Sequence, residues 1–440
     1  MVERSTSSGE DTGSWLFRVL RRVVDLQPRE TKALAWSWLY FFCVLSAYYV
    51  IRPLRDEIGA AGGVAKLPWL FAGTLIGMAV ANPPFSALVS RLAPVRFISL
   101  TYRFFTANLL LFLVLLDRTT GNQNVWVGRI FFVWVAIFNL FVVAVFWGFL
   151  VDVFDNDQGR RLFGFISAGG TLGGIAGSVL TSTLVTHTGR AFLLLVSAAL
   201  LEIAVFSVRR LSRVSGGLRE RQADRARETA IGGGVISGFS HTLKSPYLLN
   251  ISAYMLLSAI LATFLYFQQA DIAQHSFTDR ALRAAFFADV DLAVNILTLG
   301  IQLLATARIL KRLGVAITLT LLPALSVAGF LLLGLAPALW TIVVIQVLRR
   351  AVDFAVARPT REILFTVVPR EDKYKAKSFI DTFVYRAGDQ IGAWSYALMG
   401  FFGLALAGIS FAAVPISILW LANGLGLGRR QEKMALPVLE

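Results

Sequence analysis

The residues of this chain best suited to chemistry are charged side chains inside long apolar stretches. Arg386 and Asp389 lie about ten residues into the stretch 378–400, which would place them about 15 Å deep in a helix that crosses a bilayer. An ion at that depth costs roughly 2.5–3.5 kcal/mol on insertion scales and is usually paired. Residues three apart share a helix face, so we expect this pair to interact. Either the pair locks the structure, or Arg386 binds an anionic substrate and Asp389 is its resting partner.

A second group of charges follows the apolar stretch 33–51. Arg52, Arg55 and Asp56 are predicted to lie at the outer end of that stretch, where cations are otherwise scarce. Two interpretations remain open: the arginines extend to the membrane interface, or they form a positive vestibule that attracts anions. The second interpretation makes Arg55 a candidate binding residue.

The second half of the chain offers further polar candidates. Asp291 and Asn295 are four apart in the stretch 285–306 and fall on one helical stripe, which we expect to face a cavity and which could serve a proton or a cation. Arg350 and Arg361 belong to an arginine cluster near the predicted cytoplasmic end of the stretch 338–357. They are either topological anchors or guanidinium forks for phosphate or carboxylate.

Signatures of catalysis and of metal binding are lacking in the sequence. The motifs HExxH and Walker A do not occur, and no GxSxG has a plausible partner. The chain has one cysteine, and its three histidines are far apart, so a disulfide or a metal cluster within the chain is not expected. We therefore predict a protein that is not an enzyme and that needs no cofactor or metal.

The composition indicates that the helices carrying these residues lie in a membrane. Of the 440 residues, 56% are hydrophobic and only 16% are charged, whereas soluble domains are about a quarter charged. The mean hydropathy is +0.66. Apolar runs long enough to span a bilayer occur near 33–51, 68–90, 98–116, 126–151, 162–186, 191–208, 246–268, 285–306, 314–335, 338–357, 378–400 and 402–424.

The distribution of positive charge predicts the orientation. With both termini in the cytoplasm, about 32 of the 42 Lys and Arg residues fall in cytoplasmic segments. This bias also accounts for the net charge of +15 without a nucleic-acid partner. We expect a multi-pass protein of the bacterial inner (plasma) membrane that works as a monomer.

A polar break divides the predicted spans into six and six. The expected segments are a cytoplasmic N-terminal tail, a first bundle, a cytoplasmic linker, a second bundle and a cytoplasmic C-terminal tail, at 1–31, 32–208, 209–245, 246–424 and 425–440. The predicted fold class is an all-α membrane protein with twelve transmembrane helices in two six-helix bundles. This layout is similar to the major facilitator architecture, in which the substrate lies between the halves near the midplane.

Glycines dominate the fifth predicted span, which reads SAGGTLGGIAGS. Gly169, Gly173 and Gly177 recur at four-residue intervals and would let another helix approach closely. A phosphate-binding loop is the alternative, but no strand precedes the glycines and no Lys-Ser/Thr follows them. We predict helix packing.

Three stretches resemble the ATP/ADP translocases of plastids and intracellular bacteria. The most specific is RPTREILFTVVPREDKYKAKSFIDTFVYRAGDQIGAW at 358–394. The others are the Leu-Arg-Asp that ends at Asp56 and the VFWGF at 145–149. The resemblance covers roughly 32–424 and implies a twelve-helix carrier that exchanges nucleotides. It implies binding roles for Arg55, Arg361 and Lys377.

Two acidic positions of that family have no counterpart here. The stretches 131–145 and 262–269 hold no Asp or Glu. A related carrier of another phosphorylated or anionic solute is therefore also consistent with the resemblance. The prediction is a secondary transporter of an anionic organic solute, with nucleotides as the first candidate class. The alternatives are a carrier of lipids or cell-wall precursors and a membrane scaffold or sensor that transports nothing.

Overall fold

The computed structural model describes residues 26–215, 242, 245–368, 376–377 and 379–435, and among these it contains helices and no strand. The first half comprises α2 (Thr31–Ala61), α3 (Leu67–Arg91), α4 (Pro94–Arg118), α5 (Gly121–Val153) and α6 (Asn156–Val214). α6 holds two spans, because Gly189 adopts φ 74° inside it and turns the chain. A positive φ of this kind is readily adopted only by glycine.

The second half is also helical, and two of its spans contain π-helical segments. It comprises α9 (Pro246–Ser276), α10 (Arg280–Leu304), α11 (Thr306–Leu335), α12 (Leu339–Val352), α13 (Arg358–Leu364), α15 (Tyr385–Phe401) and α16 (Leu406–Ala435). π-helical segments join α12 to α13 at Asp353–Ala357 and precede α15 at Ile380–Val384.

The described helices account for twelve spans in two bundles. Nine helical stretches are long and apolar enough to cross a membrane. One of them, α6, crosses twice. The two spans around the π-helical segments complete the set. The protein is thus an all-α membrane protein with two six-helix bundles, as the sequence predicts.

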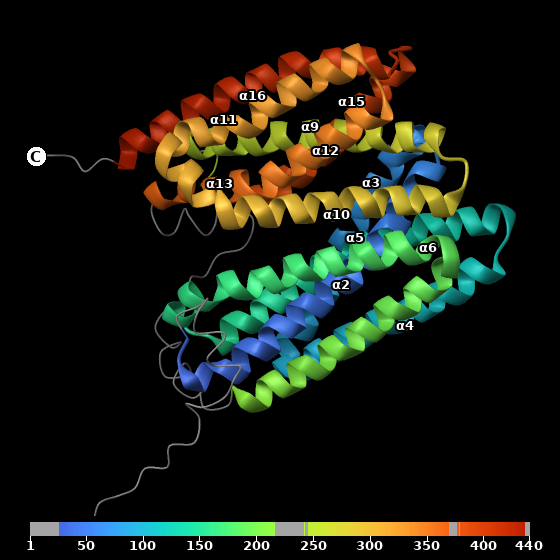
Figure 1. Cartoon of the computed structure of the whole chain (residues 1–440), viewed down its shortest axis with the longest axis vertical. Helices are drawn as coiled ribbons and strands as arrows, with labels where there is room; N and C mark the ends of the chain where they lie inside the picture. Colours follow the sequence, from blue (N-terminus) through green and yellow to red (C-terminus); the bar gives the residue numbers. More distant parts are fainter. Residues whose placement is uncertain (1–25, 216–241, 243–244, 369–375, 378, 436–440) are drawn as a thin grey trace, which may run out of the picture.

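The two bundles lie one above the other in Figure 1, blue to green below and yellow to red above, except that α3 reaches toward the upper bundle. Each has its own hydrophobic core. One core is built mainly from Leu26 to Leu211 and the other mainly from Tyr247 to Leu427. Leu67 and Leu70 of α3 join the second core, so the bundles meet at this side of the molecule.

Polar caps begin several helices where the sequence changes from loop to apolar run. At the start of α6, Asp155 accepts from the backbone N–H of Gln158 at 2.8 Å, and the Gln158 side chain accepts from Asp155 N at 3.1 Å. Asp279 similarly caps α10 by accepting from Leu282 N at 2.8 Å. Such caps satisfy N–H groups that have no partner within the helix.

The glycines of α6 confirm the predicted helix packing. A Cβ on Gly173 would lie 2.3 Å from the backbone oxygen of Phe42, and one on Gly177 would lie 2.5 Å from that of Ser46. The backbones of α2 and α6 therefore touch directly. Gly174 faces the other bundle, since a Cβ there would lie 3.1 Å from the Asn295 amide.

The observed helices extend beyond the predicted apolar runs at several ends. The first span continues to Ala61 instead of ending at 51, so Arg52 and Arg55 lie within α2. Part of the expected C-terminal tail is helical, because α16 reaches Ala435. The expected linker at 209–245 begins as the last turns of α6. Most of the rest of that linker lies outside the described residues.

Candidate functional site

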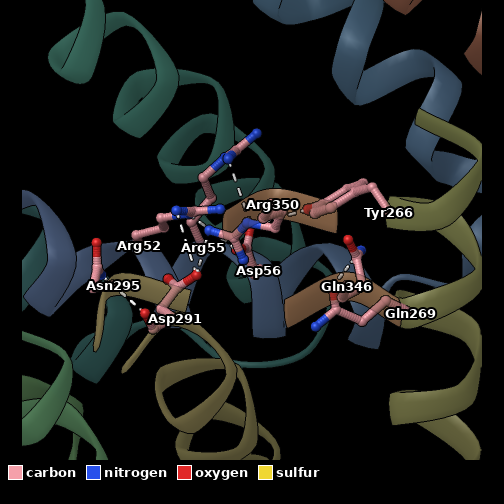
Figure 2. Close-up of polar contacts among 9 residues, drawn as sticks. All are labelled: Arg52, Arg55, Asp56, Tyr266, Gln269, Asp291, Asn295, Gln346 and Arg350. Carbon is pink, nitrogen blue, oxygen red and sulfur yellow. Dashed lines mark hydrogen bonds and ion pairs between the residues drawn. The ribbon is translucent and has the colours of Figure 1, made fainter. Parts of the chain in front are cut away.

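Charged side chains from both bundles converge where α2 meets the second bundle (Figure 2). α2 supplies Arg52, Arg55 and Asp56, which the continuous helix places one turn apart or less. α10 supplies Asp291, and α12 supplies Arg350. We call these five residues the central charge cluster.

Asp291 joins the two bundles. Its Oδ1 lies 2.7 Å from an Nη of Arg350 and 3.4 Å from an Nη of Arg52. The Asp291 side chain is 2% exposed. Asn295, one turn further along α10, donates to the Asp291 backbone oxygen at 2.9 Å and is buried. One carboxylate oxygen is thus shared by arginines of different bundles.

Asp56 makes the second such connection. Arg52 and Arg55 approach its carboxylate at 3.6 Å and 3.5 Å, and the hydroxyl of Tyr266 in α9 donates to it at 3.0 Å. The Arg55 guanidinium also lies over the ring of Phe132, 4.2 Å from its centroid. The Arg55 side chain is therefore largely enclosed, at 16% exposed, beside an aspartate that contacts the second bundle. The sequence places Arg55 beyond the end of the apolar run at 51, whereas α2 continues past it to Ala61.

The central charge cluster carries more positive than negative charge. Three arginines face two aspartates, and the arginine side chains are only 14–17% exposed. Nε of Arg52, Nε of Arg55 and Oδ2 of Asp291 are buried without a hydrogen-bond partner. Buried polar groups are nearly always satisfied, so the two arginine N–H groups are donors available to an anion, whereas the Asp291 oxygen is an unused acceptor.

Two buried amides extend the site in the second bundle. Gln346 of α12 donates to Gln269 Oε1 of α9 at 2.8 Å and to the Leu265 backbone oxygen at 3.2 Å. Figure 2 shows the pair close to Tyr266. The predicted site lacked Tyr266, Gln269 and Gln346. A polar side chain in the middle of an apolar span is the signal that could have identified them.

Arg361 and Lys377 belong to other ion pairs, outside the central charge cluster. Arg361 lies 3.7 Å from Asp381 and donates to the Met255 sulfur at 3.0 Å. Lys377 pairs with Glu362, the neighbour of Arg361. The two π-helical segments contribute Asp353 and Asp381 to this region, and π-helical turns occur frequently at functional sites.

The predicted interaction of Arg386 with Asp389 is confirmed. Arg386 donates to Asp389 Oδ2 at 3.0 Å, and its side chain is 33% exposed. Asp389 is buried and also accepts from Thr263 of α9 at 3.5 Å. The pair is separate from the ion pairs of Asp291, so the predicted site residues fall into three groups.

A further set of polar contacts joins the bundles nearer the end of α2. Glu57 is 1% exposed and accepts from Arg280 at 2.9 Å and from Arg283 at 3.0 Å, both at the start of α10. Ser182 of α6 donates to Asp289 of α10. These contacts hold the two bundles together at this end of the molecule.

The arrangement is suited to binding anions. Guanidinium groups form paired hydrogen bonds with phosphate or carboxylate. Among the described residues, no group of three or more His, Cys, Asp or Glu side chains is placed to hold a metal ion.

Solved structures with the same fold are transporters. A bacterial homologue of the iron transporter ferroportin, in an inward-facing state, has a TM-score of 0.63 at 12% identity and covers 93% of this chain and 99% of its own. A bacterial homologue of the human lysosomal transporter Spinster has a TM-score of 0.58 at 14% identity, covering 94% and 100%. A nucleoside transporter has a TM-score of 0.53 at 14% identity, covering 93% and 100%.

The comparison with curated proteins finds no match. The model of the Major Facilitator Superfamily matches residues 17–371, which is more than half of the chain. The sequence match and the twelve-helix fold agree. This protein therefore belongs to the Major Facilitator Superfamily.

Proposed function

We propose that this protein is a secondary carrier of an anionic organic solute that works by alternating access. One observation carries the proposal: arginines of both bundles share Asp291 in a buried cluster that has an excess of positive charge. Burial of such a cluster costs free energy. An anion that the cluster must bind would explain why the cost is tolerated.

In the proposed mechanism the aspartates hold the arginines until substrate arrives. An anion takes over Arg52 and Arg350, and Asp291 is released from one or both of them. The ligand then contacts both bundles, so its binding energy can depend on how the bundles are arranged. A ligand shifts a conformational equilibrium only through such a difference in affinity.

Nucleotides are the first candidate class of substrate. The resemblance to ATP/ADP translocases implies roles for Arg55, Arg361 and Lys377, and Arg55 lies in the central charge cluster. Arg361 and Lys377 lie next to one another in a second group of ion pairs. In this proposal the two groups act in sequence, with the second receiving the anion at the membrane surface. Arg386 is the candidate for a third contact with the transported anion.

A ligand screen followed by counterflow tests the proposal. The purified protein is screened by thermal shift against nucleotides, sugar phosphates and cell-wall precursors. A bound ligand at about 100 times its Kd stabilises the folded state by about 2.7 kcal/mol. We expect an anion to stabilise the wild type and to exchange across proteoliposomes that are preloaded with it.

Arg350→Gln should lose both the thermal shift and the exchange. Arg103→Gln is the matched control, because Arg103 lies in a span but is 54% exposed and pairs only weakly with Glu202. Stabilisation by cations or neutral solutes alone would refute an anion carrier. Binding without counterflow would instead favour a sensor.

The proposed orientation places both termini and the 209–245 linker in the cytoplasm of a bacterial cell. The excess of Lys and Arg in these segments supports it. Reporter fusions after Gly216 and at the C-terminus should both report the cytoplasmic side. A C-terminal fusion active only in the periplasm would contradict the six-plus-six arrangement.

A further inference from the structure

An apolar groove of about 630 Å³ lies between α3 and α5, away from the central charge cluster. Its α5 wall runs from Trp126 to Ile137, or about 16 Å along the helix. That length is about half of the roughly 30 Å hydrocarbon core of a bilayer. The groove therefore has the length of one membrane leaflet.

The groove opens toward the membrane. Trp69 is 64% exposed, Ile130 is 58% exposed and Trp126 is 56% exposed. On a membrane-spanning helix, exposed apolar side chains of this kind contact lipid, and tryptophans gather at the level of the headgroups. Gly73 keeps the space open beside Val133, because it adds no side chain to the α3 wall.

Two cations lie in the lining of this groove, Lys66 just before α3 and Arg129 in α5. The Arg129 guanidinium lies over the ring of Trp126, 4.7 Å from its centroid. Within the described part of the chain neither cation forms an ion pair, and no acidic residue lines the groove. Two unpaired cations toward one end of an apolar groove are complementary in charge and shape to a lipid with an anionic headgroup.

The groove also adjoins the seam between the bundles. Trp69 makes an edge-on contact with Trp394 of α15, with ring centroids 5.0 Å apart. α3 belongs to the first half and α15 to the second, so this contact must change if the bundles rock. A lipid in the groove would lie beside a contact that depends on the arrangement of the bundles.

We propose that this groove is a binding site for an anionic phospholipid, with the phosphate at Lys66 and Arg129 and one acyl chain along α5. The headgroup lies in the leaflet next to the loop between α2 and α3. This site is independent of the transported solute and of the proposed carrier function.

Lipid titration of the purified protein in mixed micelles tests this site. Dioleoyl phosphatidylglycerol is compared with dioleoyl phosphatidylcholine, which has the same acyl chains, and retained lipid is counted by native mass spectrometry. A membrane-surface cation is worth about 1 kcal/mol toward an anionic lipid, or about fivefold in affinity. Lys66→Gln with Arg129→Gln should therefore weaken phosphatidylglycerol binding by about 25-fold and leave phosphatidylcholine binding nearly unchanged.

Arg118→Gln is the control, because Arg118 is an exposed cation at the same end of the molecule but outside the groove. It should keep the wild-type preference. Ile130→Trp, which fills the groove and leaves both cations, should weaken the binding of both lipids. Equal phosphatidylglycerol binding by the wild type and the double variant would overturn the proposal. So would equally tight binding of free glycerol phosphate, which has the headgroup chemistry without the chain.

Discussion

At the scale of single residues, Asp291 has the most demanding position. It is buried, and its Oδ1 is shared by Arg52 and Arg350 from different bundles. Removing one partner from a buried ion pair leaves an uncompensated charge, whereas removing both can be nearly neutral. Stability and transport should therefore respond differently to changes at this residue.

We predict that Asp291→Asn lowers the free energy of unfolding by about 3 kcal/mol, because it leaves Arg350 without its carboxylate partner. Adding Arg350→Gln should recover most of that loss and leave transport low, since the double variant still lacks a binding arginine. Thermal unfolding in detergent of the wild type, the two single variants and the double variant measures the coupling between Asp291 and Arg350. The exposed pair Arg103 and Glu202 should give a coupling of only about 0–1 kcal/mol. Additive losses at Asp291 and Arg350 would contradict the coupling.

A charge swap tests whether Arg386 binds substrate. Arg386→Asp with Asp389→Arg keeps opposite charges three residues apart, so expression lost in the single variants should return. Transport should stay poor, because the cation has moved almost one helical turn and now lies at the buried position beside Thr263. Uptake into proteoliposomes is the measurement. Full recovery of transport would mean that the pair is only structural.

The pairing of Arg386 with Asp389 could be predicted because their spacing is local to one helix. The sharing of Asp291 could not, because Arg52, Asp291 and Arg350 meet only through the packing of three helices. The burial of Arg55 was missed for another reason. The apolar run ends at residue 51, but the helix continues because its last turns are buried against other helices instead of lipid.

At the scale of helices, α6 depends on glycine for its close contact with α2. A Cβ at Gly173 would lie 2.3 Å from the Phe42 backbone oxygen, which cannot move without moving α2. A Cβ at Gly164, in the same helix, would meet nothing within 4 Å. Alanine at these two positions therefore separates the steric effect of an added Cβ from the effect of alanine's helix propensity.

Gly173→Ala should lower the free energy of unfolding by about 1–3 kcal/mol, the usual cost of overpacking. Gly164→Ala should be neutral or slightly stabilising, because alanine favours the helix. Thermal unfolding of the two variants under identical conditions makes the comparison. Equal effects would mean that the close approach of α2 and α6 does not limit stability.

The number of spans could be predicted from apolar length, and the two interrupted spans show what that signal misses. The segment 338–357 reads as one apolar run, yet it contains the π-helical turn Asp353–Ala357. Hydropathy averages over such a turn, because the side chains remain mostly apolar. Only the altered hydrogen-bond register of the backbone distinguishes it.

At the scale of the whole molecule, the ion pairs of Glu57 and the contact of Ser182 with Asp289 join the bundles at one end. An alternating-access carrier must separate these contacts in part of its cycle. Contacts within a bundle can remain unchanged. Arg103 and Glu202 provide such a contact, since both belong to the first bundle and lie 3.6 Å apart.

A thiol cross-link between the bundles should therefore stop transport. Ser182→Cys with Asp289→Cys places two thiols across the seam, and the only native cysteine, Cys43, is buried. Treatment with a short bifunctional thiol reagent that contains a disulfide should reduce transport by more than tenfold, and a reductant should restore it. The same reagent on Arg103→Cys with Glu202→Cys should leave transport unchanged, because that link lies within one bundle. Undiminished transport in a fully cross-linked Ser182–Asp289 variant would show that the bundles do not separate there. Loss in both cross-linked variants would mean that the first bundle itself must deform during transport.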